Sequence, residues 1–132
     1  MIAKNNIFNI RQGSYWRGMT GTRKGFVEFM NRSYAIRAWL VLMRTYRRRY
    51  GLKTIRQIVT RFAPPTENDT ALYVEQCAAW TGLGPDEELT CRLDYAFLAK
   101  AMARKETGTS LNAEQVLEVM YQFNINIFEY KN

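Results

Sequence analysis

The chain has 132 residues, of which 47% are hydrophobic and 14% aromatic, and its formal net charge is +7. This length and composition suffice for one compact domain with a substantial core, so we expect a single domain over residues 1–132 that is a monomer. No segment approaches the roughly 20 apolar residues of a membrane span, and the first fifteen residues hold no apolar run of signal-peptide length. We therefore expect that the protein does not insert into a membrane. We also expect that it is made in the cytoplasm without a signal peptide.

Metal-binding side chains are scarce in this sequence. It holds two cysteines, Cys77 and Cys91, and no histidine, which nearly excludes a zinc site of the usual Cys/His type. We expect two small thiols that are buried or half-buried, and we expect neither a metal nor another cofactor.

Basic residues are concentrated in the first half of the chain. Residues 1–62 hold fourteen Lys and Arg against a single acid, Glu28, which gives a balance of +13. Residues 63–132 hold five Lys and Arg against eleven acids, a balance of −6, so the two halves together give +7. This asymmetry favours a polyanionic partner for the first half, either nucleic acid or an anionic cell wall, although a solvated helix face explains any individual arginine equally well.

The segment from residue 4 to residue 29 consists of short apolar pieces broken by glycines, which predicts turns or a small hairpin. A first helix is predicted over residues 33–50, ended by Gly51, because apolar residues recur there at i, i+3 and i+4 spacings. These residues are Ile36, Trp39, Leu40, Met43, Tyr46 and Tyr50. Three arginines lie away from this stripe and are expected on a solvated face: Arg44, Arg47 and Arg48.

Four further helices are predicted from apolar spacing and from residues that start or stop helices. They are expected over residues 54–62, before Pro64-Pro65; from Asn68 or Asp69 to Gly82; over residues 92–106, before Gly108; and from Asn112 to about Phe123. In the last helix Gln115 follows Asn112 by three residues, as in a capping box. The sequence therefore predicts a mainly helical protein with one small β-hairpin or extended element near its start.

One carboxylate continues an apolar stripe of the fourth predicted helix. Leu98, Met102 and Glu106 are spaced i, i+4 and i+8, so they share a face that differs from the wetter face of Lys100 and Arg104. Glu106 also lies in the last turn, where the helix dipole disfavours an anion. Desolvation and the dipole both favour the protonated carboxyl group that a general acid needs. The alternative is a frayed, exposed glutamate beside a lysine.

The N-terminal segment resembles two groups of proteins. Asn6-Ile7-Phe8-Asn9-Ile10-Arg11, followed by Trp16 and Gly18, is similar to the Asn-Leu-Phe-Gly-Ile-Lys...Trp-x-Gly segment of bacterial glucosaminidases of the autolysin and flagellar type. It is still more similar to the Asn-Asn-Pro-Gly-Asn-Ile-Arg opening of small phage-associated proteins, from which it departs at Ile7 and Phe8. That resemblance runs to about Glu106 through Ile36-Arg37-Ala38, Arg49-Tyr50-Gly51, Ala63-Pro64-Pro65-Thr66-Glu67-Asn68-Asp69-Thr70 and Tyr73.

A third resemblance covers the stretch from Pro65 to Val74. Its Glu67, Thr70 and Tyr73-Val74 resemble the Pro...Glu-Thr-x-x-Tyr-Val stretch of lytic transglycosylases, in which the tyrosine lies beside the catalytic acid. The resemblance implies a lysozyme-like helical domain. In that fold a helix ending in glutamate precedes the extended element, whereas here the order is reversed. We therefore expect a circular permutation that returns Glu106 to the segment around Asn6 and Phe8.

These resemblances imply an enzyme that cleaves peptidoglycan glycan strands, as a lytic transglycosylase or as a glucosaminidase or muramidase. Such an enzyme would be made in the bacterial cytoplasm and would reach the cell wall after phage-mediated release or as a virion component. Glu106 is the expected general acid/base, with Tyr73 beside it. A sugar cleft also needs planar amides for hydroxyl and N-acetyl groups and aromatic faces for pyranose rings. The expected substrate-binding residues are Asn6, Phe8, Asn9, Tyr15, Trp16, Glu67 and Thr70.

The alternative for the opening segment is structural. Asparagine and glycine also serve turns, and Phe8 and Ile10 then belong to the core. A second carboxylate is not evident, because Glu28 alternates with apolar neighbours as an exposed residue does and Glu67 suits the start of the third helix. A single acid suffices where the substrate's own 6-hydroxyl or N-acetyl group attacks, so the transglycosylase route is weakly favoured.

Two other classes of function are compatible with the sequence. One is a non-enzymatic virion or peptidoglycan-binding protein with the same fold. The other is a helix-turn-helix formed by residues 33–50 and 54–62, with four arginines on phosphates: Arg47, Arg48, Arg49 and Arg56. We do not favour nucleic acid as the partner, because these arginines surround a turn that has no polar, base-reading face.

Overall fold

The computed structural model describes residues 2–128. Over these residues the chain forms a two-stranded antiparallel hairpin followed by five helices, which confirms the predicted mainly helical class. The elements are β1 (Met19–Arg23), β2 (Phe26–Phe29), α1 (Arg32–Tyr50), α2 (Ile55–Phe62), α3 (Thr70–Thr81), α4 (Arg92–Thr107) and α5 (Ala113–Gln122). None of the helices in this part of the chain is both long enough and apolar enough to cross a membrane.

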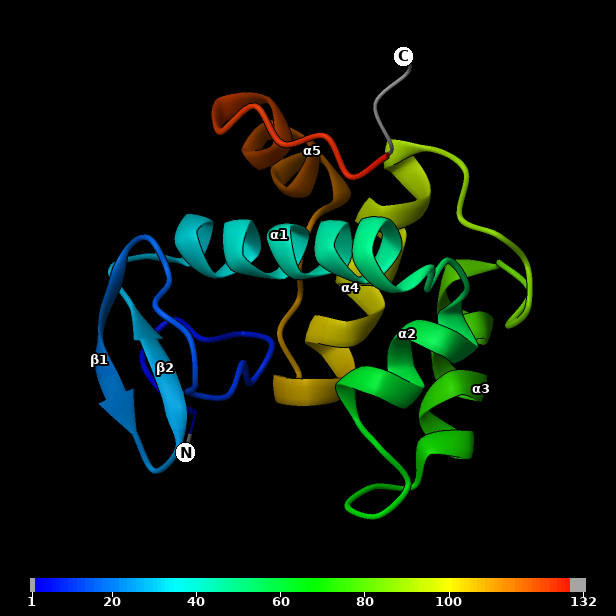
Figure 1. Ribbon diagram of the computed structural model, residues 1–132, viewed down its shortest axis with the longest axis horizontal. Coiled ribbons are helices and arrows are strands. Elements are labelled where there is room, and N and C mark those ends of the chain that lie inside the picture. The colour runs from blue at the N-terminus through cyan, green and yellow to red at the C-terminus, as the bar shows by residue number, and fades with distance from the viewer. Residues whose placement is uncertain (1, 129–132) are drawn as a thin grey trace.

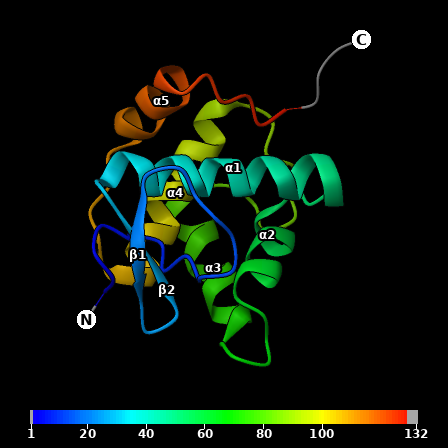
Figure 2. The ribbon, with the colours of Figure 1, turned by 60° about the vertical axis from the view of Figure 1, so that its left-hand side comes forward.

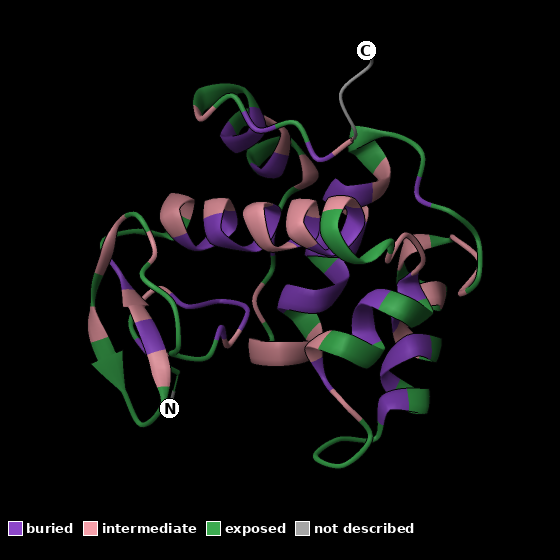
Figure 3. Cartoon of the chain, in the orientation of Figure 1, coloured by how far each residue is buried: buried purple, intermediate pink, exposed green. Residues whose placement is uncertain are grey.

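The helix α1 runs through the middle of the molecule, with the hairpin beside its first turns (Figure 1). The helices α2 and α3 lie on one side of α1, and α5 lies on the other side in both views (Figures 1 and 2). Many of the buried residues lie along α1 and α4, which cross at the centre of the molecule (Figure 3). Trp39 and Met43 of α1 and Leu98 and Met102 of α4 are fully buried there. The apolar faces of α1 and α4 therefore form the centre of the core, which the hairpin and the other three helices cover.

The hairpin has the turn chemistry that twisted strands require. The backbone φ angles of Lys24 and Gly25 between the strands are both positive, 49° and 89°. Positive φ at both central residues is the mark of the tight turn that joins antiparallel strands with two residues. One strand edge is irregular between Met19 and Gly21, so the register shifts there.

The helix ends are fixed by local side chains. Asn31, Thr54 and Asp69 accept hydrogen bonds from backbone N–H groups at the starts of α1, α2 and α3, and each such cap stabilises a helix by about 0.5–2 kcal/mol. Gly51, Gly82 and Gly108 end α1, α3 and α4 in the left-handed conformation. The predicted Asn112–Gln115 capping box is present at the start of α5.

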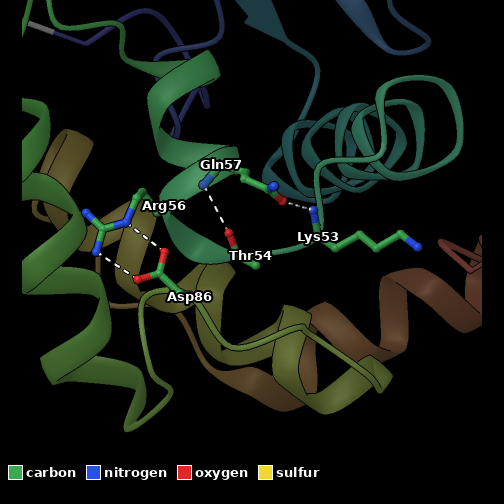
Figure 4. Close-up of polar contacts among 5 residues, drawn as sticks. All are labelled: Lys53, Thr54, Arg56, Gln57 and Asp86. Carbon is green, nitrogen blue, oxygen red and sulfur yellow. Dashed lines mark hydrogen bonds and ion pairs between the residues drawn. The ribbon is translucent and has the colours of Figure 1, made fainter.

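The start of α2 also carries an ion pair with a distant loop (Figure 4). Thr54 accepts from the Gln57 backbone N–H, and the Gln57 side chain accepts in return from the Lys53 N–H. Arg56 makes a forked contact with Asp86, at 2.7 and 3.0 Å. This pair joins α2 to the loop between α3 and α4.

The prediction for the second half of α1 was wrong at two residues. Arg47 is buried, and its guanidinium donates to the Leu89 carbonyl at 2.9 Å and to the Tyr95 hydroxyl at 3.4 Å. Tyr50, which the apolar stripe assigned to the core, is 44% exposed. The loop before α4 covers α1 at Arg47, whereas the chain turns away at Gly51 and leaves the last residue of the helix in solvent.

The same contacts count against the helix-turn-helix alternative. Arg47 is buried, Arg56 is paired with Asp86, and the Arg48 guanidinium donates to the carbonyls of Asn126 and Phe128 at 2.6 and 2.7 Å. Three of the four arginines expected on phosphates therefore bind within the protein.

Candidate functional site

A cleft of about 520 Å³ opens between the N-terminal segment and the end of α2. One wall comes from residues 9–14 and Trp16, and the other comes from Phe62, Ala63 and Asn68. The side chains of Leu42 and Tyr46 from α1 line it as well. Six of its residues matter most for chemistry: Asn9, Arg11, Gln12, Trp16, Asn68 and Glu106.

Glu106 is the only acid among the described residues that line this cleft. Its carboxylate is half-buried and accepts one hydrogen bond on each oxygen. The Asn9 amide donates to Oε1 at 3.2 Å, and the Tyr73 hydroxyl donates to Oε2 at 2.8 Å. The structure thus brings together three residues that the sequence analysis selected from distant parts of the chain.

The N-terminal segment is held against the end of α4 by side-chain bonds to backbone. Asn9 also donates to the Glu106 carbonyl at 3.1 Å, and the Thr107 hydroxyl donates to the Ile7 carbonyl at 2.8 Å. Asn9 itself has a φ of 54°, in the left-handed region that asparagine tolerates better than most residues. Asn9 therefore shapes the backbone and also restrains the carboxylate.

Tyr73 is buried beneath Glu106, with 3% of its surface exposed. Burial and the nearby Glu106 carboxylate raise the pKa of Tyr73 far above its ordinary value. The phenol therefore stays protonated and remains a hydrogen-bond donor to Glu106 at any physiological pH. The Lys105 ammonium lies 5.8 Å from the centre of the Tyr73 ring, which places one positive charge near this pair.

Cys77 lies one helical turn after Tyr73 but does not supply a nucleophile. Its side chain is buried, and burial raises its pKa to about 12. The thiolate is the reactive form of cysteine, so the thiol is inert near neutral pH. Cys91 is exposed, which corrects the expectation that both thiols are at least half-buried; it precedes α4 as the N-cap residue, outside the core.

Three of the expected substrate-binding residues are buried and cannot contact a sugar. Asn6 is fully buried, where its amide donates to the carbonyls of Ile10 and Val27 and accepts from the Ile10 N–H. Phe8 is fully buried and stacks on Trp39, with ring centres 5.4 Å apart. The structural alternative is therefore correct for both residues, and it also accounts for the buried Ile10.

Thr70 is the third of these buried residues. It is only 8% exposed, and its hydroxyl donates to the Ala63 carbonyl at 2.6 Å. This bond joins the first turn of α3 to the end of α2, so Thr70 supports one wall of the cleft from behind.

The other expected residues are accessible to different degrees. Trp16 is half-buried and lines the cleft, whereas the neighbouring Tyr15 is 86% exposed and lies outside its lining. Glu67 is exposed and forms an ion pair with Arg11 at 3.2 Å. This contact joins the N-terminal segment to the loop before α3, beside the cleft. Glu28 is half-buried and accepts from the Lys4 N–H, so it is neither exposed nor part of the lining.

Several cleft residues were not selected from the sequence. Gln12 and Asn68 add planar amides to the lining, and Phe62 and Tyr46 add aromatic surface. Burial raises the pKa of Tyr46 to about 12, so it is also a neutral phenol. Arg11 and Asn68 belong to the segments on which the sequence resemblances rest, so the sequence contained a signal for these two residues. Tyr46 and Phe62 occupy ordinary apolar helix positions, and no sequence signal distinguished them from core residues.

Comparison with known proteins identifies one similar phage protein. Protein P5 of Pseudoalteromonas phage PM2 is 34% identical to this chain over 115 residues, which cover 83% of this chain and 71% of that protein. No protein-family model matches the sequence.

Proposed function

This chain belongs to the family of Protein P5 of Pseudoalteromonas phage PM2, and we propose that it cleaves the glycan strand of bacterial peptidoglycan. The observation that carries the proposal is the Glu106 carboxyl group in a cleft, held by the Asn9 amide and the Tyr73 hydroxyl. The lysozyme-like fold with circular permutation, which the sequence resemblances imply, is part of the same proposal. The enzyme would act after phage-mediated release or as part of a virion.

In this mechanism Glu106 first acts as a general acid. Its proton passes to the oxygen of the glycosidic bond, and the bond between that oxygen and the anomeric carbon breaks. A protonated carboxyl group keeps lone pairs for both existing hydrogen bonds, so Asn9 and Tyr73 can orient it while it donates toward the cleft. A positioned general acid or base contributes about 10²–10⁴-fold to a rate.

The same carboxylate then acts as a general base. It takes the proton of the sugar's own 6-hydroxyl, whose oxygen bonds to the anomeric carbon and closes a 1,6-anhydro ring. A protein nucleophile is not required. This route is favoured because hydrolysis by two carboxylates needs a second one about 5–9.5 Å away, and Glu106 is the only acid in the described lining.

The remaining cleft residues suit a carbohydrate. Gln12 and Asn68 offer amide donors and acceptors for hydroxyl and N-acetyl groups, and the Trp16 ring offers an apolar face for a pyranose. With Asn9, these residues replace Asn6 and Phe8 as the proposed sugar contacts.

The test is release of dye from labelled peptidoglycan sacculi by the purified protein. We expect Glu106→Gln to lose at least about 100-fold in rate, because the amide has no proton to donate, while the thermal unfolding temperature stays close to wild type. Glu75→Gln, which removes an exposed acid of α3, is the matched control and should retain full activity. Equal activity of Glu106→Gln and wild type would remove Glu106 from the mechanism.

A second candidate is a non-enzymatic virion or wall-binding protein. It is favoured by the fact that both oxygens of Glu106 already accept hydrogen bonds within the protein, as those of a structural glutamate do. Sedimentation with intact sacculi separates the two candidates, because a binding protein would co-sediment with the sacculi and release no muropeptides at any protein concentration.

A further inference from the structure

A second groove lies over α4, away from the cleft. Two hollows of about 360 and 140 Å³ share the side chains of Lys100 and Arg104. Successive helix residues are rotated by about 100°, so Arg104 is about 200° around α4 from Glu106. The groove therefore opens on the opposite face of the helix from the candidate acid.

The two cations of this groove are available to a ligand. Lys100 and Arg104 are exposed, and neither pairs with a carboxylate among residues 2–128. Arg104 is held in place instead by stacking over the Trp80 ring, at 4.0 Å from its centre. A guanidinium fixed through its flat face keeps its N–H edge free for an anion.

The walls of the groove are of two kinds. Trp80 and Phe97 supply aromatic surface in the smaller hollow, and Trp80 is 36% exposed. The larger hollow is lined by Thr109 and Ser110. The Thr109 hydroxyl lies 2.6 Å from that of Thr107, and a serine hydroxyl can donate or accept one hydrogen bond to a polar ligand. Cations, aromatic surface and hydroxyls thus meet along one face of α4.

The C-terminal end of a helix ordinarily repels an anion, but two carbonyls in the last turns of α4 already accept hydrogen bonds from the residues that follow the helix. The N–H groups of Gly108 and Thr109 donate to the carbonyls of Arg104 and Ala103. The local charge is also unusual for this part of the chain. Residues 63–132 hold only five basic side chains against eleven acids, and two of the five form this groove.

We propose that the Lys100–Arg104 groove binds the free carboxylate of a short peptide. An anion with an apolar carbon beside it satisfies both the cations and the Trp80 and Phe97 surface, whereas inorganic phosphate satisfies the cations alone. The hollows have the size of a few residues and not of a folded partner. Resting on the proposed function, the ligand is a peptide stem of peptidoglycan, on a strand other than the one in the cleft.

The test measures binding of acetyl-D-alanyl-D-alanine and of its C-terminal amide by titration calorimetry, with the full chain. We expect the acid to bind at least about tenfold more tightly than the amide, because a hydrogen-bonded charge pair is lost in the amide. Arg104→Gln and Lys100→Gln should each weaken the acid about tenfold. Arg92→Gln removes a charge from the first turn of the same helix and should leave binding unchanged.

Equal binding of acid and amide, no binding of the acid, or equal weakening by Arg92→Gln would each overturn the proposal. Inorganic phosphate that competes as strongly as the acid peptide would also overturn it, since the apolar walls would then have no role. The comparison of acid with amide needs no variant, so it stands even if a substitution impairs folding. Glu106→Gln should bind the peptide normally, so loss of wall cleavage and loss of peptide binding are separate outcomes.

Discussion

The Tyr73 hydroxyl donates a 2.8 Å hydrogen bond to Oε2 of Glu106, across 33 positions of sequence. The contact exists because α3 packs on α4, which places the buried face of α3 beneath the last turn of α4. Tyr73 is buried while Glu106 reaches the cleft, so the phenol holds the carboxyl group from behind. This arrangement makes Tyr73 a positioning residue in the proposed mechanism.

Tyr73→Phe should lower the rate of glycan cleavage by about 10–100-fold while the affinity for sacculi stays near wild type. The phenyl ring retains the packing and loses only the hydrogen bond, so the free energy of unfolding should fall by about 1 kcal/mol. Initial rates at several substrate concentrations, together with urea unfolding, provide the measurement. A loss confined to binding would count against a positioning role.

Asn9 carries two functions that substitutions can separate. Asn9→Gly keeps the left-handed backbone at φ 54° but removes the amide that bonds to Glu106. We expect a folded protein with at least about tenfold lower cleavage activity. Asn9→Ala adds backbone strain of about 1 kcal/mol and should be less stable than Asn9→Gly. Circular dichroism melting and dye release measure the two effects; full activity in Asn9→Gly would show that the amide is dispensable.

The helix ends of this protein could be predicted from sequence because they depend on neighbouring residues. Asp69, Asn112 and Gly108 act within one turn of their own position, and the structure uses each as expected. The buried state of Asn6 and Phe8 depends instead on segments far along the chain, namely the hairpin and α1. The side-chain pattern of a sugar cleft and that of an irregular, packed segment are alike, so sequence alone did not separate them.

Arg47 illustrates the same limit. Its position in α1 is correct, yet its burial follows from the loop that brings Leu89 and Tyr95 over it. Glu106 is the opposite case. Because Met102 and Leu98 lie at i−4 and i−8, the sequence predicted that Glu106 faces the protein. The resemblances then indicated that Glu106 lies near the N-terminal segment and Tyr73. The cleft around it also needs Phe62 and Tyr46, which no local pattern distinguished from core residues.

Gly18→Ala should destabilise the fold by more than about 2 kcal/mol. A Cβ at this residue would lie 2.1 Å from Cγ of Tyr34, and its φ of 78° adds strain. Gly25→Ala is the control, because its φ is also positive, at 89°, and the space around it is open. Urea unfolding of both variants gives the comparison. Similar losses in the two would mean that Tyr34 moves aside.

Stability should fall in alkali through Cys77. Its pKa is raised by burial from 9.0 to about 12, so between these values the unfolded chain has lost a proton that the folded chain keeps. Stability from this group is complete below pH 9 and falls by about 1.4 kcal/mol per pH unit above it. Cys77→Ala should make the fall in stability between pH 9 and 10 shallower and leave the part that comes from the buried tyrosines, whose pKa values burial also raises. Cys91→Ala, at an exposed thiol, should leave the slope unchanged; identical slopes in all three proteins would contradict the assignment.

Mass spectrometry of the muropeptides released from purified sacculi tests the central claim most directly. With wild-type protein we expect fragments that end in 1,6-anhydro sugars, each lighter than the corresponding hydrolysis product by one water molecule, or about 18 Da. With Glu106→Gln we expect no fragments. Wild-type protein that releases no muropeptides, or Glu106→Gln that releases the same ones, would contradict glycan cleavage by Glu106; reducing ends in place of anhydro ends would contradict the intramolecular route.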